Sequence, residues 1–159
     1  MNTKGFSLME TLIVIGIFAV IGVIVTSSIA DSIRGTKKSD ATIRLRSNLE
    51  LSLATIERRV RNAKELSPCV AGVQMKNFSY TDQDNTTHSF SCGGGVVSID
   101  GQDITSQEIN ITTCTFVCTP PSVGLPASLD ITLSGEDLLS SGEQSANFST
   151  KSKLNLRSY

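Results

Sequence analysis

Twenty consecutive residues near the start of the chain, from Thr11 to Ala30, carry no charged side chain. An α-helix of that length rises about 30 Å, which matches the hydrocarbon thickness of a lipid bilayer. The chain has 14 basic and 15 acidic side chains, yet only Lys4 and Glu10 lie among the first thirty residues. This segregation of charge excludes an ordinary soluble domain, and a single apolar run excludes a protein that crosses the membrane several times.

The apolar run fits a membrane anchor better than a cleaved signal. A cleaved secretory signal has an apolar core of about 7–15 residues. A lipoprotein signal needs a cysteine directly after that core, whereas the first cysteine here is Cys69. A plain anchor accounts for everything except Glu10, because an ionised carboxylate in the apolar phase costs on the order of 2.5–3.5 kcal/mol near the bilayer centre and less near its edge. Glu10 therefore needs a partner and is a candidate functional residue.

The residues around Glu10 carry a more specific pattern. The run Lys4–Ile13, KGFSLMETLI, closely resembles the signal of type IV prepilins and type II secretion pseudopilins. The resemblance covers residues 4–25, where a basic residue, Gly, Phe and Glu stand at fixed offsets before an apolar run. It implies that a membrane peptidase cleaves between Gly5 and Phe6, that the new amino group of Phe6 is methylated, and that Glu10 acts in assembly.

Simple electrostatics agrees with this role for Glu10. Cleavage after Gly5 would remove Lys4 and create a cationic amine at Phe6. Two unit charges about 4 Å apart attract by roughly 4 kcal/mol at an effective dielectric constant of 20, which offsets the cost of placing the carboxylate in the apolar phase. In the family the amine is attributed to the neighbouring subunit. The implied partners are other pilin or pseudopilin subunits, the prepilin peptidase, an assembly platform in the inner membrane and, before assembly, membrane lipid.

Beyond Ala30 the pattern becomes that of an amphipathic helix. Apolar residues recur at spacings of 4, 4, 3, 4 and 3, which places them on one helix face: Leu45, Leu49, Leu53, Ile56, Val60 and Ala63. Because the residue before a proline avoids the α region, Ser67-Pro68 should end the helix near residue 66. The sequence thus predicts a leader at 1–5, a transmembrane or filament-core helix at 6–30, and an amphipathic helix at 31–66 with a soft point at Gly35-Thr36.

Residues 67–159 are predicted to form a β-rich globular head. They are rich in Ser and Thr, and their apolar residues come in short alternating runs. Strands are expected at Val73–Tyr80, His88–Cys92, Val96–Ile99, Ile109–Val117, Ser128–Leu133 and Asn147–Leu156. Asp100-Gly101 is a hairpin turn signal. The head has no Trp and few large apolar residues, so it needs the Leu45–Val60 stripe to pack on. The predicted fold is α+β, a long N-terminal helix packed against an antiparallel sheet.

Four cysteines in the predicted head are candidates for two disulfides: Cys69, Cys92, Cys114 and Cys118. A four-cysteine zinc site is the alternative, but such sites usually show two close cysteine pairs, and only Cys114 and Cys118 are close. An exported domain favours disulfides. If 109–118 is one unbroken strand, the Cα atoms of Cys114 and Cys118 lie about 13 Å apart, beyond the roughly 7 Å that a disulfide spans. The connectivity stays open at this point.

No catalytic arrangement is evident in the sequence. The only histidine, His88, has no pattern of nucleophile and acid around it, so we expect a surface residue. Asp82-Gln83-Asp84-Asn85 begins like a calcium loop but lacks the later bidentate glutamate, which favours a polar turn. The basic cluster Arg58–Arg61, beside Glu57 and Glu65, indicates a solvated or intersubunit face rather than a nucleic-acid site. We therefore expect no enzyme, no cofactor and no metal.

The sequence as a whole predicts a structural subunit of a type IV pilus or a type II secretion pseudopilus. It would be a single-pass protein of the cytoplasmic membrane, with its head outside the cytoplasm, before it enters the filament. The chain resembles minor subunits near the filament tip in two features: it has no proline before Pro68, and its helix Arg44–Glu65 is charged. The alternative is a membrane-tethered extracytoplasmic module whose head captures a substrate, a surface or DNA.

Overall fold

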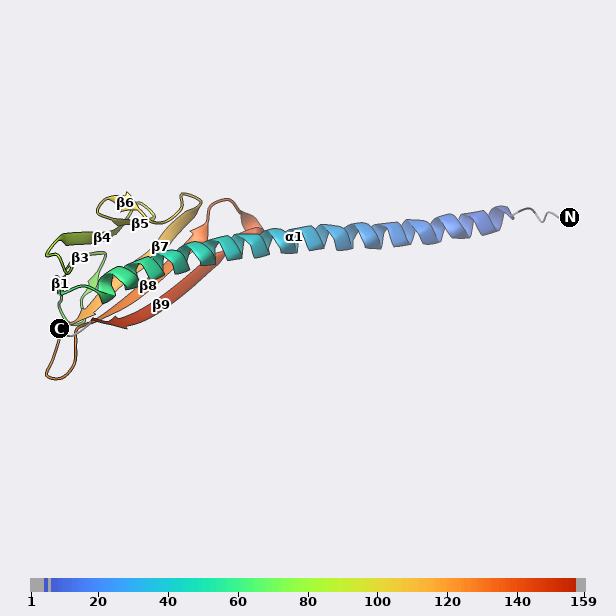
Figure 1. The fold of residues 1–159 in the computed structure, drawn as a ribbon. Helices are drawn as coiled ribbons and strands as arrows, with labels where there is room; N and C mark the ends of the chain where they lie inside the picture. The colour runs from blue at the N-terminus through green and yellow to red at the C-terminus, as the bar shows by residue number, and fades with distance from the viewer. Residues whose placement is uncertain (1–4, 6, 157–159) are drawn as a thin grey trace. The chain divides into compact units, whose positions relative to one another are not determined.

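The computed structural model describes residue 5 and residues 7–156. The chain divides into two compact units, Met1–Lys37 and Lys38–Tyr159, which we call the N-terminal unit and the C-terminal unit. The described residues form one long α-helix, nine strands in two antiparallel sheets and one short 3-10 helix (Figure 1). This confirms the predicted α+β fold class.

Helix α1 runs from Leu8 to Arg61 and contains no proline. It continues without interruption through Gly35-Thr36, the predicted soft point. The prediction that it reaches residue 66 is wrong, because Glu65–Ser67 forms strand β1 and Leu66 pairs with Tyr80. The apolar spacing that suggested a longer helix is met instead by a turn that buries Ala63 and a strand that buries Leu66.

The C-terminal unit contains a five-stranded and a four-stranded sheet. The first has the order β1-β3-β4-β5-β6, with β3 at Asn77–Thr81, β4 at Thr87–Gly93, β5 at Val96–Ile99 and β6 at Gln102–Asp103. The second has the order β2-β7-β8-β9, with β2 at Gln74–Met75, β7 at Ile109–Thr119, β8 at Ser128–Asp137 and β9 at Asn147–Asn155. The 3-10 helix η1, Gly142–Gln144, lies between β8 and β9. Figure 1 shows β7, β8 and β9 alongside the C-terminal part of α1.

The predicted strand Val73–Tyr80 is in fact two strands that belong to different sheets. Strand β2 pairs with β7, whereas β3 begins at Asn77 and pairs with β4. Lys76 stands between them, and its carbonyl accepts a hydrogen bond from the N–H of Cys92 at 2.9 Å. An alternating pattern has the same appearance in one strand as in two consecutive strands, so the change of sheet was not visible in the sequence. Of the other predicted strands, Val96–Ile99 is confirmed with the same ends and the rest are confirmed with shifted ends. The hairpin turn at Asp100-Gly101 is confirmed as well.

The hydrophobic core lies between α1 and the sheets. The predicted helix stripe is buried, and Leu45, Leu49, Ile56 and Val60 are each 0% exposed. The same cluster contains side chains from both sheets: Phe78, Phe90, Phe116, Leu129, Ile131 and Leu133. Burying one such side chain contributes about 1.5–3 kcal/mol. The stripe therefore stabilises the helix and the sheets together, as a head with a thin core of its own requires.

Both disulfides end on strand β7. Cys69 is bonded to Cys118 and Cys92 to Cys114, with Cα–Cα distances of 5.1 and 6.1 Å. Cys114 and Cys118, on one strand, are not bonded to each other, which agrees with the distance expected along a strand. The Cys92–Cys114 bridge joins β4 to β7 and thereby one sheet to the other. The cysteines are thus paired in disulfides rather than arranged as a zinc site.

Candidate functional site

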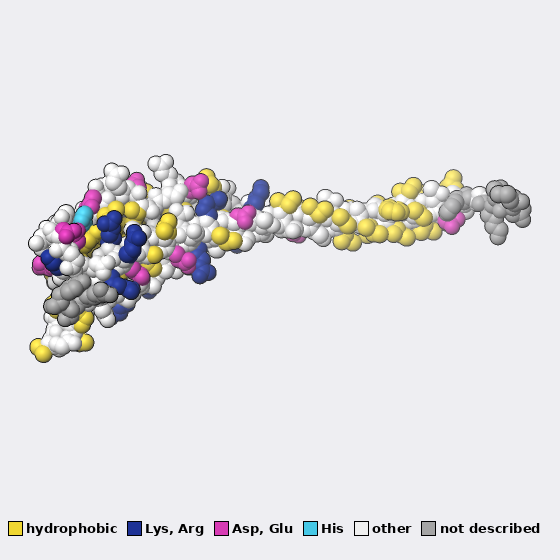
Figure 2. Space-filling model, in the orientation of Figure 1, with side chains coloured by type: hydrophobic (Ala, Val, Ile, Leu, Met, Phe, Trp, Pro, Cys, Tyr) yellow, Lys and Arg dark blue, Asp and Glu magenta, His cyan; other side chains and the backbone are white. Residues whose placement is uncertain are grey.

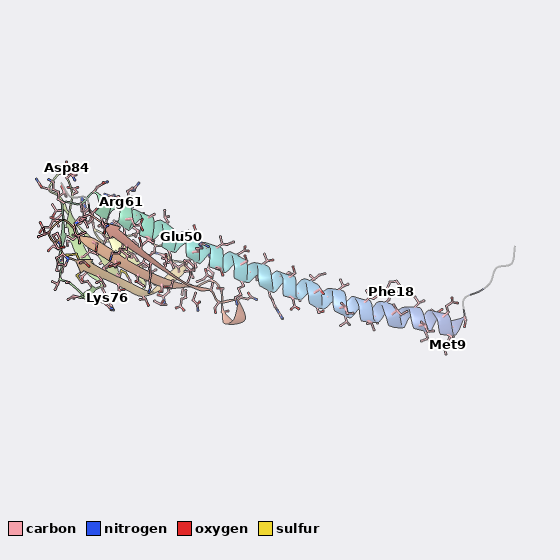
Figure 3. All side chains as sticks on the ribbon, turned by 90° about the horizontal axis from the view of Figure 1, so that it is seen from below. Met9, Phe18, Glu50, Arg61, Lys76 and Asp84 are labelled. Carbon is pink, nitrogen blue, oxygen red and sulfur yellow. A yellow bond between two sulfur atoms is a disulfide. The ribbon has the colours of Figure 1, made fainter. Side chains whose placement is uncertain are left out.

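The part of α1 in the N-terminal unit exposes apolar side chains on all of its faces. Every residue from Leu8 to Ile29 is exposed, and Phe18 is 70% exposed. Figure 2 shows hydrophobic side chains covering this stretch, and Figure 3 shows the side chains of Met9 and Phe18 pointing away from the helix. Among the described residues, α1 is the one helix long and apolar enough to cross a membrane. It is therefore compatible with a single-pass membrane anchor.

The helix begins at a capping residue that the sequence reasoning missed. The Oγ of Ser7 accepts a hydrogen bond from the N–H of Met9 at 3.3 Å, and the carbonyl of Ser7 accepts bonds from the N–H groups of Glu10 and Thr11. A serine followed three residues later by a glutamate is the capping-box pattern, which could have revealed this cap. A carboxylate in the first turn also interacts favourably with the helix dipole. Local helix structure alone thus gives Glu10 a modest stabilising role.

Glu10 nevertheless stands on an apolar surface with no cationic partner in the described part of the chain. Its side chain is exposed in the first turn, and no ion pair among the described residues includes it. Gly5, on one side of the predicted cleavage point, is also exposed. Phe6, the predicted site of cleavage and methylation, lies outside the described residues. A carboxylate in this position is costly in lipid unless a cation pairs with it.

A buried ion pair attaches α1 to the end of strand β8. The Nε and Nη2 of Arg44 donate to the two carboxylate oxygens of Asp137 at 2.9 and 3.2 Å. The side chain of Asp137 is 0% exposed and that of Arg44 is 32% exposed. The hydrogen bond from Arg44 holds the pKa of Asp137 below its ordinary value against the opposing effect of burial. The pair joins residues 93 positions apart in the chain, so it holds helix and sheet together.

The end of α1 borders a polar pocket of about 370 Å³, lined by Arg58, Arg59, Asn62, Tyr80, Asp82, Gln83 and Asp84. Figure 3 labels Asp84 and Arg61 at this end of the C-terminal unit. The lining has two arginines and two aspartates, so the predicted basic cluster is part of a surface of mixed charge. The hydroxyl of Tyr80 is buried without a hydrogen-bond partner among the described residues, and desolvation raises the pKa of this phenol. The pocket has no excess of charge that would select an anion or a cation.

His88 lies close to two carboxylates beside this pocket. Its side chain is 22% exposed, so this histidine lies at the surface of the C-terminal unit and is partly covered by its neighbours. Asp82 belongs to the polar turn between β3 and β4, and Asp100 to the hairpin turn between β5 and β6. Strand pairing places both turns next to His88, which no spacing in the sequence indicated. In the part of the chain that the structure describes, no group of His, Cys, Asp and Glu residues has the arrangement of a metal site.

One further feature is an exposed apolar loop, residues 119–127, which joins β7 to β8. All four prolines of the chain lie in this loop and in the segment 67–73 that the Cys69–Cys118 disulfide ties to it: Pro68, Pro120, Pro121 and Pro126. Neither segment contains a charged residue. Two backbone hydrogen bonds between Ser122 and Leu125, at 3.0 and 2.9 Å, leave Val123 fully exposed. The loop therefore presents apolar side chains to its surroundings.

No protein-family model, curated protein or solved structure matches this chain. Of the predicted site residues, the structure joins the four cysteines in two pairs and places Gly5 and Glu10 on the exposed surface. The functional assignment of the N-terminal segment therefore depends on its sequence pattern and on the exposed apolar helix.

Proposed function

We propose that this chain is a structural subunit of a type IV pilus or a type II secretion pseudopilus. The observation that carries the proposal is the exposed apolar stretch of α1 with Glu10 in its first turn. No described residue outside the helix covers that stretch, so it requires lipid before assembly and the helices of other subunits afterwards. The KGFSLMETLI run at residues 4–13 adds the processing signal that a plain anchor would not need.

Assembly would combine one ion pair with close helix packing. After cleavage behind Gly5, the amino group of Phe6 in one subunit pairs with Glu10 of its neighbour, and this neutralises the carboxylate in the apolar filament core. Gly16 and Gly22 have open space around them and permit neighbouring helices to approach closely. The prepilin peptidase and an inner-membrane assembly platform act on the chain before this stage.

The C-terminal unit would lie outside the cytoplasm and form the filament surface. Its two disulfides support this placement, because disulfides persist in oxidising compartments. The role of a minor subunit near the filament tip agrees with a helix that has no proline. Deletion of a tip subunit that primes assembly should abolish filaments, and complementation with the wild-type chain should restore them. Normal filament numbers after deletion would contradict the priming role.

Replacing Glu10 by alanine tests the proposal directly. The variant should insert into the membrane and be processed at Phe6, but little of it should enter filaments, because the neighbouring amine lacks its carboxylate. The measurement is the amount of the chain in sheared filaments relative to membranes, together with mass spectrometry of its N-terminus. Glu50→Ala is the matched control, since Glu50 is an exposed glutamate of the same helix that pairs with Arg46 at 2.7 Å.

Two results would contradict the proposal. Wild-type incorporation of Glu10→Ala would remove the assembly role of the carboxylate. An intact Met1 on the wild-type chain, in place of a methylated Phe6, would reject the processed-pilin function as a whole.

A second candidate function is a membrane-tethered binding module, and the apolar loop 119–127 favours it. In that function the helix only anchors the chain, while Val123 and Leu125 contact the captured surface. Glu10→Ala would then leave surface attachment and DNA uptake by the cells unchanged, whereas Val123→Ser with Leu125→Ser would reduce them. The filament function predicts that Glu10→Ala causes the larger loss.

A further inference from the structure

The two ring nitrogens of His88 face carboxylates that belong to two different turns. Nδ1 lies 2.7 Å from Oδ2 of Asp100, and Nε2 lies 3.4 Å from Oδ2 of Asp82. The imidazole is stacked on the ring of Tyr80, with centroids 5.2 Å apart. Arg59 of α1 also acts on the cluster, because its positive charge favours the ionised forms of both Tyr80 and Asp100. Arg58 and Asp84 line the pocket beside Tyr80 and Asp82.

The protonation state of His88 decides how many of these contacts are attractive. A neutral imidazole has one N–H group and one lone pair, whereas the imidazolium has two N–H groups. Only the imidazolium can donate to Asp82 and Asp100 at once. In the neutral form, the shorter contact to Asp100 keeps the proton on Nδ1, and the lone pair of Nε2 then faces the carboxylate of Asp82.

Asp82 is the residue that closes the turn between β3 and β4. Its Oδ1 accepts hydrogen bonds from the N–H groups of Asp84 and Thr86 at 2.9 and 3.0 Å. The carboxylate of Asp100 instead attaches the β5–β6 turn to strand β4, because its Oδ1 accepts the N–H of Ser89 at 2.7 Å. His88 therefore bridges one carboxylate that closes the β3–β4 turn and one that attaches the β5–β6 turn to β4.

The same β3–β4 turn is attached to the end of helix α1. The side-chain amide of Gln83 donates to the carbonyl of Asn62 at 3.1 Å, and the ammonium of Lys64 donates to the side chain of Asn85 at 2.8 Å. Gln83 and Asp84 of this turn also line the polar pocket beside Arg58 and Arg59. A change at Asp82 thus acts on one wall of that pocket.

We propose that His88 is a pH-dependent clamp, which in its doubly protonated form joins Asp82 of the β3–β4 turn to Asp100 of the β5–β6 turn and which releases Asp82 when it loses a proton. This device goes beyond the proposed filament role and does not depend on it. It gives the surface at the end of α1 a response to the acidity of the surrounding medium.

The pKa values support the direction of this response. The hydrogen bond to Asp100 raises the pKa of His88 above its ordinary 6.5, although burial opposes the shift. Backbone hydrogen bonds from Thr86 and Ser89 lower the pKa values of Asp82 and Asp100 respectively. Because the folded pKa of His88 is raised, the clamp is fully closed below pH 6.5 and opens as the pH rises through the raised value. Because the pKa values of Asp82 and Asp100 are lowered from their ordinary 3.8, both carboxylates stay charged at pH values where a free aspartate would begin to be protonated.

The clamp can be tested on the full-length chain in detergent micelles. Because His88 is the only histidine, nitrogen NMR of its ring gives the pKa and the tautomer without overlap. We expect a pKa above 6.5, a proton on Nδ1 in the neutral form, and a lower pKa in Asp82→Asn and in Asp100→Asn. Asp130→Asn is the control, since Asp130 is a surface aspartate of the other sheet.

Hydrogen exchange supplies the structural measurement. After correction for intrinsic rates, exchange of the Asp84 and Thr86 amides should become faster across the titration of His88. The increase should be about tenfold for each pH unit by which its pKa exceeds 6.5. His88→Gln should remove this pH dependence while the protection of β7 and β8 stays as in the wild type. A pKa at or below 6.5, or exchange at these two amides that does not follow His88, would overturn the proposal.

Discussion

The two parts of helix α1 differ in what surrounds their apolar side chains. From Leu8 to Lys37 the helix is exposed apart from Ala30, whereas from Lys38 to Arg61 one stripe is buried against the sheets of the same chain. A helix that is apolar on all faces requires a surrounding apolar phase, and a helix with one apolar stripe requires a single packed face. The second part is therefore stabilised within the chain, while the first depends on an apolar environment that the described residues of the chain do not supply.

Removal of a disulfide should cause the largest loss in the free energy of unfolding of the C-terminal unit, with no effect on the N-terminal unit. Cys69→Ser with Cys118→Ser should cost about 4 kcal/mol, because the bridge closes a sequence separation of 49 residues. Cys92→Ser with Cys114→Ser should cost about 3 kcal/mol, since the separation is 22. Urea unfolding followed by circular dichroism gives both values. In detergent, the helical signal of the N-terminal unit should stay unchanged in both variants. Loss of that signal together with the unfolding of the C-terminal unit would contradict the separate stability of the two units.

A matched pair of leucines tests the two parts of the helix at the level of one side chain. Leu49 is 0% exposed and Leu12 is 57% exposed. Leu49→Ala should lower the free energy of unfolding of the C-terminal unit by about 3 kcal/mol, as is usual for a buried leucine, whereas Leu12→Ala should leave it unchanged. Urea unfolding of both variants in the same detergent is the measurement. Equal effects would show that the two units do not have separate stabilities.

The ion pair between Arg44 and Asp137 should contribute less than the core. Arg44→Ala leaves a buried carboxylate without its partner and should cost about 2 kcal/mol. Removing the exposed pair of Arg46 and Glu50 should cost about 0.5 kcal/mol or less. Double-mutant cycles on the two pairs give the coupling energies. A coupling for the exposed pair as large as that for the buried pair would contradict this ranking.

The smallest expected effect is a decrease in the stability of the C-terminal unit at low pH, caused by protonation of Asp137. The folded-state pKa of Asp137 is lowered, so its stabilisation is complete above its ordinary pKa of 3.8 and is lost as the pH falls through the lowered value. Melting temperatures of the C-terminal unit, measured in the full chain between about pH 2.5 and 5, should fall at the acid end, and less steeply in Asp137→Asn. Asp31→Asn in the exposed part of the helix is the control. An identical slope in all three proteins would exclude Asp137 as the cause.

Much of the fold was predictable because local periodicity reports which face is buried. The spacing of Leu45, Leu49 and Ile56 predicts the stripe that the structure buries, and alternation predicts most strands. The end of α1 and the division of the strand at Lys76 were not predictable. At both places the local pattern fits two conformations, and the choice between them depends on pairing with residues far away in the chain.

The candidate sites divide in the same way. Glu10 was recognisable because a charged residue beside an apolar run can be read directly from the sequence. The cap at Ser7 could have been recognised from the same stretch. The cluster around His88 was not, since Asp82 and Asp100 reach it only through the pairing of β3 with β4 and of β4 with β5. Cysteine pairing belongs to this second group, because a count of cysteines contains no distances.

The sequence by itself determined the apolar stretch, its lone carboxylate and the class of the fold, because these follow from hydropathy and from the period of local structure. Only the tertiary structure decided where α1 ends, which cysteines are joined, and which carboxylates face His88. Those features depend on contacts between residues distant in the chain, and such contacts exist only when the buried stripe of α1 has brought the two sheets together.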